Sequence, residues 1–117
     1  MGINIHVYSY WGVRTEYNND VSDRWNDLDE QDISPVNDVE ILMDGMSGEY
    51  MVFGVRLYDS GDSRWGEMIN SNEVEVNDAI LETMRSEYMS KFKTLYPDQY
   101  EWLAAKPWRL VNLVHYS

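Results

Sequence analysis

Residues 74–96 read VEVNDAILETMRSEYMSKFKTLY, and this stretch has the clearest helical pattern in the chain. Its apolar side chains recur every three or four residues, which is the spacing of one face of an α-helix. The spacing predicts a helix over Val74–Tyr96, with its first turn capped by Asn72 or by Asn77. The side chains expected to pack against a sheet are Ile80, Met84, Tyr88 and Phe92.

The first half of the chain is typical of strands. Residues 3–13 alternate apolar and other side chains, as a half-buried strand does. Val39–Met43 and Glu49–Tyr58 flank Asp44–Gly48, whose two glycines suit a turn, and this arrangement predicts a hairpin.

The chain ends with a short helix and a further strand in this interpretation. Pro97 stops the long helix and can start a second one that runs to Ala105. Trp108–Tyr116 is apolar on both faces, which predicts a strand in a central position. The whole chain, residues 1–117, is expected to form a single α+β domain. Its small antiparallel sheet of about four strands would pack on the long helix of the C-terminal half.

The negative charge of the chain is concentrated in one segment. Acidic side chains outnumber basic ones by 21 to 9, and Glu16–Glu49 holds eleven carboxylates with Arg24 as its one cation. Within it, residues 18–38 are rich in Asn, Asp and Ser and are expected to form an acidic loop after the first strand. A helical turn over Val21–Leu28 is the alternative, because Val21, Trp25 and Leu28 share helical spacing.

Composition argues against several functional classes. The chain has no cysteine, and it lacks phosphate-binding glycine loops and nucleophile-elbow motifs, so we expect no catalytic residue and no cofactor. Few, scattered cations argue against direct binding to nucleic acid or to a membrane surface. No stretch approaches the ~20 apolar residues of a membrane span. With no cysteine and no signal-peptide pattern, a cytoplasmic location is expected.

Clustered carboxylates raise the question of a metal site. Asp27, Asp29 and Asp32 lie close together in the sequence, as do Asp59 and Asp62. Neither group has the ligand spacing of a calcium loop. We therefore expect a solvated acidic segment and no bound metal.

Charge and aromatic content together favour a protein partner. The chain holds five Trp and nine Tyr, and Trp and Tyr are side chains that anchor interfaces. Carboxylates spaced along a surface can imitate phosphates and occupy the basic groove of a nuclease or another nucleic-acid-binding enzyme. The predicted partner-binding residues, with Trp25 as the exposed anchor, are Asp20, Asp23, Trp25, Asp27, Asp29, Glu30, Asp32 and Asp38.

In size, acidity and lack of cysteine and catalytic motifs, the chain is similar to viral antagonists of restriction and CRISPR systems. It is similar in the same traits to bacterial immunity proteins that block nuclease toxins. The resemblance implies a non-enzymatic inhibitor that acts by protein–protein interaction, with DNA mimicry as the mode of action. One alternative is that the charge serves only solubility.

Another alternative is a small-ligand-binding or enzymatic domain with its site among the aromatic and histidine side chains of the sheet. The residues concerned are His6, Tyr8, Tyr10 and His115. If the two terminal strands pair, the two imidazoles can approach one another or a carboxylate and form a base or a metal site. The ordinary interpretation of the same pattern is that both histidines lie on a strand face, where they are hydrogen-bonded or exposed to solvent.

Overall fold

The computed structural model describes residues 5–32, 39–45, 47–60 and 73–116, and structural statements concern these residues. The elements in chain order are β1 (Ile5–Glu16), α1 (Asn19–Glu30), β2 (Ile41–Met43), β3 (Tyr50–Asp59), α3 (Asp78–Leu95), α4 (Tyr100–Ala104) and β4 (Arg109–Tyr116). The strands form one antiparallel sheet in the order β2-β3-β1-β4. The predicted α+β class, with a four-stranded antiparallel sheet and a long helix in the C-terminal half, is confirmed.

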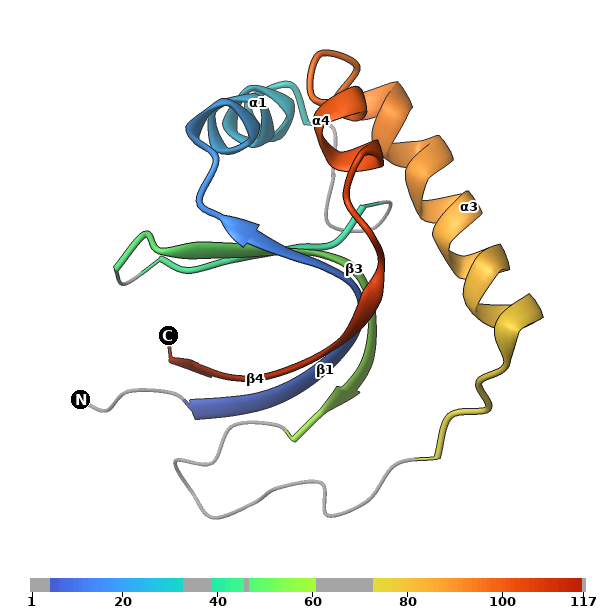
Figure 1. Ribbon diagram of the computed structural model, residues 1–117. Coiled ribbons are helices and arrows are strands. Elements are labelled where there is room, and N and C mark those ends of the chain that lie inside the picture. The colour runs from blue at the N-terminus through green and yellow to red at the C-terminus, as the bar shows by residue number, and fades with distance from the viewer. Residues whose placement is uncertain (1–4, 33–38, 46, 61–72, 117) are drawn as a thin grey trace.

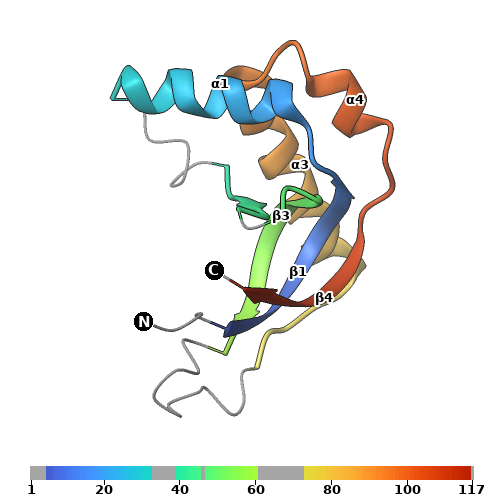
Figure 2. The same cartoon turned by 90° about the vertical axis from the view of Figure 1, so that its left-hand side faces the viewer.

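The sheet is strongly curved, and helices α1, α3 and α4 lie on its convex side (Figures 1 and 2). The main core fills the space between this side and the helices, and its buried residues are Val13, Val21, Leu28, Val39, Met51, Phe53, Tyr88, Met89, Phe92, Tyr96 and Leu103. A smaller cluster of Tyr8, Tyr10 and Val52 lies apart from the main core. No helix of the described residues is long and apolar enough to cross a lipid bilayer.

Two glycines face one another across the two central strands. Gly12 of β1 pairs with Gly54 of β3. A Cβ atom on Gly12 would overlap the carbonyl oxygen of Phe53, and one on Gly54 would lie 2.7 Å from the Cα of Gly12. Gly54 also has a φ of 151°, which side chains of L residues rarely permit. The strands therefore approach one another here as only glycine allows, which suits the strong curvature of the sheet.

Helix α3 begins four residues later than the sequence pattern predicts. Asn77 Oδ1 accepts a hydrogen bond of 2.9 Å from the backbone N–H of Ile80, so Asn77 is the cap and Asp78 the first helical residue. Val74 and Val76 precede the helix and are 40% and 45% exposed. Asn72, the other predicted cap, lies outside the described residues.

The first part of the predicted acidic loop is a helix. Asn18 Oδ1 accepts hydrogen bonds from the backbone N–H groups of Asp20 and Val21, at 2.9 and 3.2 Å, and so caps α1. Val21 and Leu28, two turns apart, are buried in the main core. The helical alternative is correct here, and the loop prediction is wrong for Asn19–Glu30. Burial of one apolar stripe outweighs the turn-forming tendency of the Asn and Asp residues.

Strand β4 lies at an edge of the sheet, so the prediction of a central position is wrong. Among the described strands it pairs with β1 alone. Helix α3 packs mainly against β3 and β1, and three apolar side chains of β4 stay about half exposed: Leu110, Val114 and Tyr116. The predicted hairpin, by contrast, is confirmed by the pairing of β2 with β3. The carboxylate of Asp44 stabilises its turn by accepting hydrogen bonds from the N–H groups of Ser47 and Glu49.

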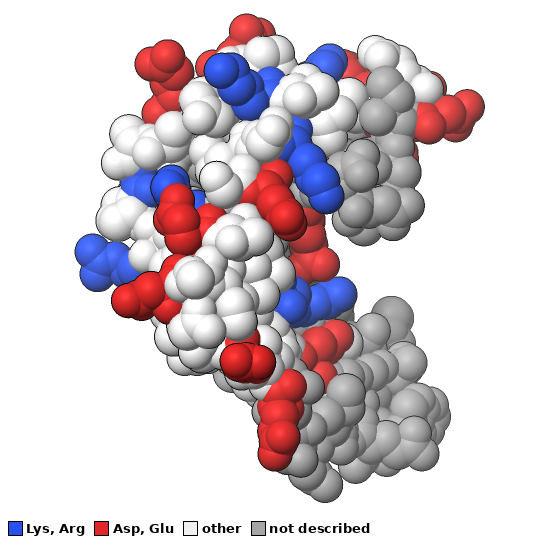
Figure 3. All heavy atoms as spheres, turned by 90° about the vertical axis from the view of Figure 1, so that its right-hand side faces the viewer, with Lys and Arg blue, Asp and Glu red and all other residues white. Residues whose placement is uncertain are grey.

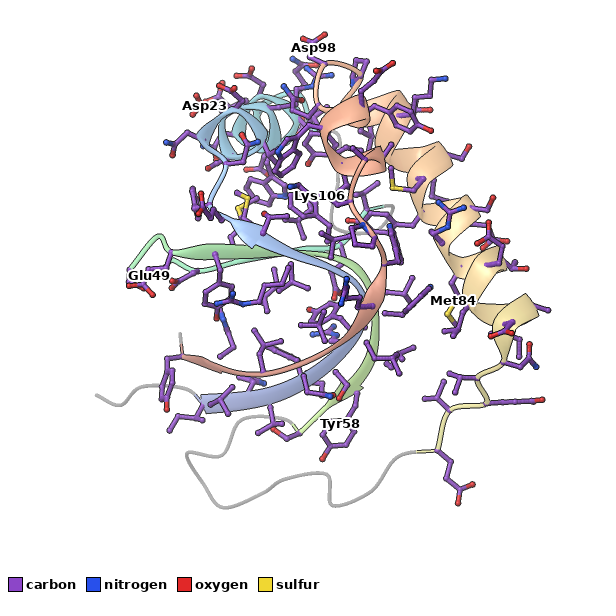
Figure 4. All side chains as sticks on the ribbon, in the orientation of Figure 1. Asp23, Glu49, Tyr58, Met84, Asp98 and Lys106 are labelled. Carbon is purple, nitrogen blue, oxygen red and sulfur yellow. The ribbon has the colours of Figure 1, made fainter. Side chains whose placement is uncertain are left out.

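The apolar side chains of α3 that face the sheet are buried to different extents. Substitutions at these positions should therefore lower the free energy of unfolding by different amounts. Phe92 is fully buried, stacks on Tyr96 and meets the edge of Phe53, whereas Met84 points toward the sheet but is only partly buried (Figure 4). We expect Phe92→Ala to lower the free energy of unfolding by about 3–5 kcal/mol. Met84→Ala should cost clearly less. Urea denaturation of both variants measures this, and equal losses would contradict the packing described.

The glycine pair predicts a second, position-specific loss of stability. Gly54→Ala forces a Cβ against the β1 backbone and a disfavoured φ, so we expect a cost of about 3 kcal/mol or complete loss of folding. Gly45 is the matched control, because a Cβ there meets no atom within 4 Å. Gly45→Ala should stay within about 0.5 kcal/mol of the parent. Equal melting temperatures for the two variants would contradict a structural role of the glycine pair.

Candidate functional site: an acidic row on helix α1

Four carboxylates form a row along the outer surface of α1. Asp20, Asp23, Asp27 and Glu30 follow one another at intervals of three, four and three residues, and all four are exposed. Residues at these intervals lie on one face of a helix. With a rise of about 1.5 Å per residue, the row extends over about 15 Å. We call these four residues the acidic row.

The acidic row borders a pocket between α1 and the segment that precedes α4. The pocket has a volume of about 600 Å³ and is lined by Asp20, Asp23, Arg24, Asp27, Pro97, Asp98 and Gln99. Asp98 therefore adds a carboxylate from a distant part of the sequence, and Figure 4 shows it at the same end of the molecule as Asp23. Among the described residues, no group of three His, Asp or Glu side chains is placed to hold a metal ion.

Arg24, the one cation of the acidic segment, makes a contact between two helices. Arg24 donates a hydrogen bond of 2.9 Å from Nε to the backbone carbonyl of Leu95, at the end of α3. A cation there satisfies a carbonyl that lacks a helical partner and opposes the negative end of the helix dipole. This contact holds α1 against α3.

The other predicted partner-binding residues have different positions. Asp29 is exposed on α1 but lies outside the row, and Asp32 is exposed just after the helix with a φ of 59°. Trp25 is half-buried rather than fully exposed, at helical spacing with Val21 and Leu28 of the core. Asp38 lies outside the described residues. Sequence reasoning missed Asp98, because no local pattern links it to α1.

The histidines and tyrosines of the alternative site do come together. Strands β1 and β4 pair with His6 opposite His115. His6 Nδ1 lies 2.9 Å from Asp59 Oδ1, and His115 Nδ1 lies 2.7 Å from the Tyr50 hydroxyl. The ring of Tyr8 lies 5.3 Å from that of His6 and 5.9 Å from that of His115, measured between ring centroids. Tyr10 meets Tyr8 edge-on at 5.8 Å.

Burial dominates the electrostatics of this aromatic cluster. Desolvation raises the pKa of Tyr8, with Asp59 adding to the rise, and it raises the pKa of Tyr10, with a hydrogen bond to Glu40 adding to the rise. Desolvation also lowers the pKa of His115. Protonated tyrosines and a neutral imidazole make hydrogen bonds, but a raised tyrosine pKa is the opposite of what an activated nucleophile needs. Tyr8, Tyr10 and His115 are at most 7% exposed, so they offer a ligand little surface.

Comparisons with protein-family models, with curated proteins and with solved structures found no match to this chain. The functional assignment therefore rests on the residues of the chain itself.

The lowered pKa of His115 predicts a loss of stability in mild acid. The unfolded chain binds this proton more readily than the folded one, so the contribution is complete above the unfolded pKa of about 6.5 and is lost as the pH falls through the folded value. The groups that face His115 are His6 and Tyr8 of β1, Tyr50 of β3 and Asp44 of the hairpin turn.

Urea denaturation between about pH 7.5 and 5.5 tests this expectation. The free energy of unfolding should fall in the parent and fall less in His115→Gln. His6 is retained in both proteins, so the difference between them reports on His115. An equal fall in both would show that His115 does not cause the pH dependence.

Proposed function

We propose that this protein is a non-enzymatic antagonist whose acidic row docks in a basic groove of a nucleic-acid-handling enzyme. The acidic row carries the proposal, because its four exposed carboxylates share one face of a helix. Asp98 extends the same negative surface across the neighbouring pocket. The row is the part of the acidic segment whose geometry suits a partner.

The spacing of the row suits the imitation of phosphates. Its members are separated by about 4.5–6 Å along the helix axis, since each residue rises about 1.5 Å. One strand of duplex DNA carries a phosphate about every 3.4 Å of helix axis. The row thus offers about two thirds of that charge density, in a rigid line that a groove lined with Lys and Arg can accept.

The distribution of charge over the molecule also supports this proposal. On the face that carries α3, acidic and basic side chains are interspersed (Figure 3). Helix α3 itself pairs Glu82 with Arg85 at 2.7 Å. Beside the acidic row the one cation that lines the pocket, among the described residues, is Arg24, which donates to the carbonyl of Leu95, so carboxylates are in clear excess there. Exposed charges of one sign mainly accelerate association with a complementary partner.

The proposal places the chain, by its charge and size, with anti-restriction, anti-CRISPR and immunity-type inhibitors. It includes action in the cytoplasm, which agrees with the lack of cysteine. It does not include direct binding to nucleic acid, which a formal net charge of −12 opposes.

A second candidate function is the binding of a small ligand at the aromatic cluster. The pairing of His6 with His115 favours it, and the low exposure of the cluster weighs against it. Ionic strength separates the two candidates, because docking through the acidic row should weaken steeply with salt, whereas binding of an uncharged ligand at the aromatic cluster should not.

Neutralising the row tests the proposed function. The variant carries Asp20→Asn, Asp23→Asn, Asp27→Asn and Glu30→Gln, which keep the size of each side chain. The parent should inhibit DNA cleavage by at least one enzyme in a panel of restriction endonucleases, RNA-guided nucleases and nuclease toxins. Against that enzyme, we expect association of the variant to be slower by about tenfold or more at physiological salt.

A control variant with the same net charge removes four exposed carboxylates elsewhere. These are Glu73, Glu75, Glu87 and Glu101, each changed to Gln. It should inhibit like the parent, because the position of the charge matters and not only its sum. An equal loss in both variants, or a parent that inhibits no enzyme of the panel, would count against the proposal.

A further inference from the structure

Three of the nine Lys and Arg side chains line one small pocket, and no carboxylate of the described residues lines it. The pocket has a volume of about 280 Å³ and is lined by Gly12, Val13, Arg14, Lys106, Pro107, Arg109 and Val111. Acidic side chains outnumber basic ones by 21 to 9 in the chain, so this lining is opposite to the overall composition. We call it the basic pocket.

The fold brings the three cations together from separate parts of the chain. Arg14 lies on β1, Arg109 on β4, and Lys106 in the connection between α4 and β4. Arg109 pairs directly with Gly12 across the two strands, and Gly12 adds no side chain to the space beside it. The same glycine that allows the close approach of β1 to β3 therefore also lines the basic pocket.

The cations of the basic pocket keep their charge available. Among the described residues, the Lys and Arg side chains that form ion pairs are Arg56 and Arg85. The guanidinium of Arg14 lies 5.0 Å from the ring centroid of Tyr50, and Lys106 Nζ lies 5.1 Å from that of Trp102. An aromatic ring orients and stabilises a cation without neutralising it. The described lining of the pocket thus carries three cationic side chains in an acidic protein.

A larger pocket adjoins the basic pocket and shares two of its residues. It has a volume of about 650 Å³, and both Arg14 and Lys106 line it. Glu16 and Asp20 also line it, so its far side is acidic. An anionic group is therefore favoured in the basic pocket, while the adjoining space suits an uncharged remainder of the same molecule.

We propose that the basic pocket binds the phosphate group of a small phosphate monoester. The guanidinium of Arg109 offers paired N–H donors that match phosphate oxygens, and Arg14 and Lys106 help to balance a charge of about −2. The pocket volume of about 280 Å³ is just below the range of about 300–1,000 Å³ that is typical of pockets for drug-sized ligands. At physiological salt, charges more than about 8 Å away are largely screened, so the remote carboxylates do not prevent binding.

The nearby carboxylates favour a small ligand over a phosphate polymer. A nucleic acid strand would place further phosphates beside Glu16 and Asp20, where they are repelled. The inference does not depend on the acidic row, and it goes beyond the proposed antagonist function.

Titration with inorganic phosphate, followed by amide chemical shifts in ¹H–¹⁵N spectra, tests the proposal. The amides of Gly12, Lys106 and Arg109 should shift saturably, and chloride at equal ionic strength should not shift them. We expect Lys106→Gln and Arg109→Gln each to weaken binding by about tenfold. Lys91→Gln is the matched control, because Lys91 is an exposed cation on α3 away from the pocket, and it should bind like the parent.

Three results would overturn the inference. These are unchanged affinity in both pocket variants, equal weakening in Lys91→Gln, and equal shifts with chloride. A single-stranded oligonucleotide that binds more tightly than phosphate through the same residues would replace the small ligand with a polymer. Thermal melts confirm that each variant is folded. The variant with the neutralised acidic row should bind phosphate at least as tightly as the parent, because it lacks the carboxylate of Asp20, so the two proposals can fail separately.

Discussion

The close backbone contact between Gly12 and Gly54 fixes how the two central strands of the sheet pack together. Any side chain at either position would collide with the backbone of the opposite strand. The curved sheet has all three described helices on its convex side, with the main core beneath them. The same pairing leaves space beside Arg109, which helps to form the basic pocket. One backbone contact thus contributes both to the shape of the core and to a charged surface site.

The core and the acidic surface are connected through aromatic packing and one arginine. Phe92 of α3 packs between Tyr96, Tyr88 and Phe53 of the core. Tyr96 is fully buried, and burial raises its pKa to about 12, so its hydroxyl stays protonated at neutral pH. Arg24 then joins the end of α3 to α1. The acidic row is therefore carried by a helix that is anchored in the core, and a rigid row loses little conformational entropy when it docks.

Charge separation gives the molecule two distinct surfaces. The acidic row and Asp98 present carboxylates, whereas the basic pocket gathers Arg14, Lys106 and Arg109. The two surfaces meet at the larger pocket, which is lined by Asp20 as well as by Arg14. The first surface is the one that we propose for a basic protein partner, and the second is the one that we propose for a small anion. In the sheet, His6 contacts Asp59 and His115 contacts Tyr50 at hydrogen-bond distance, and burial raises the pKa of Tyr8.

Elements whose signals are local can be predicted from the amino-acid sequence. Helical spacing predicts most of α3, turn residues predict the hairpin, and the clustered charge indicates the carboxylates of α1 as a candidate interface. Tertiary structure alone decided that β4 lies at an edge, that His6 meets His115, and that Asp98 joins the acidic surface. It also brought together the cations of the basic pocket, which look scattered in the sequence. The physical reason is that periodicity records which face of an element is buried, whereas the pairing of distant strands depends on long-range contacts that no local pattern encodes.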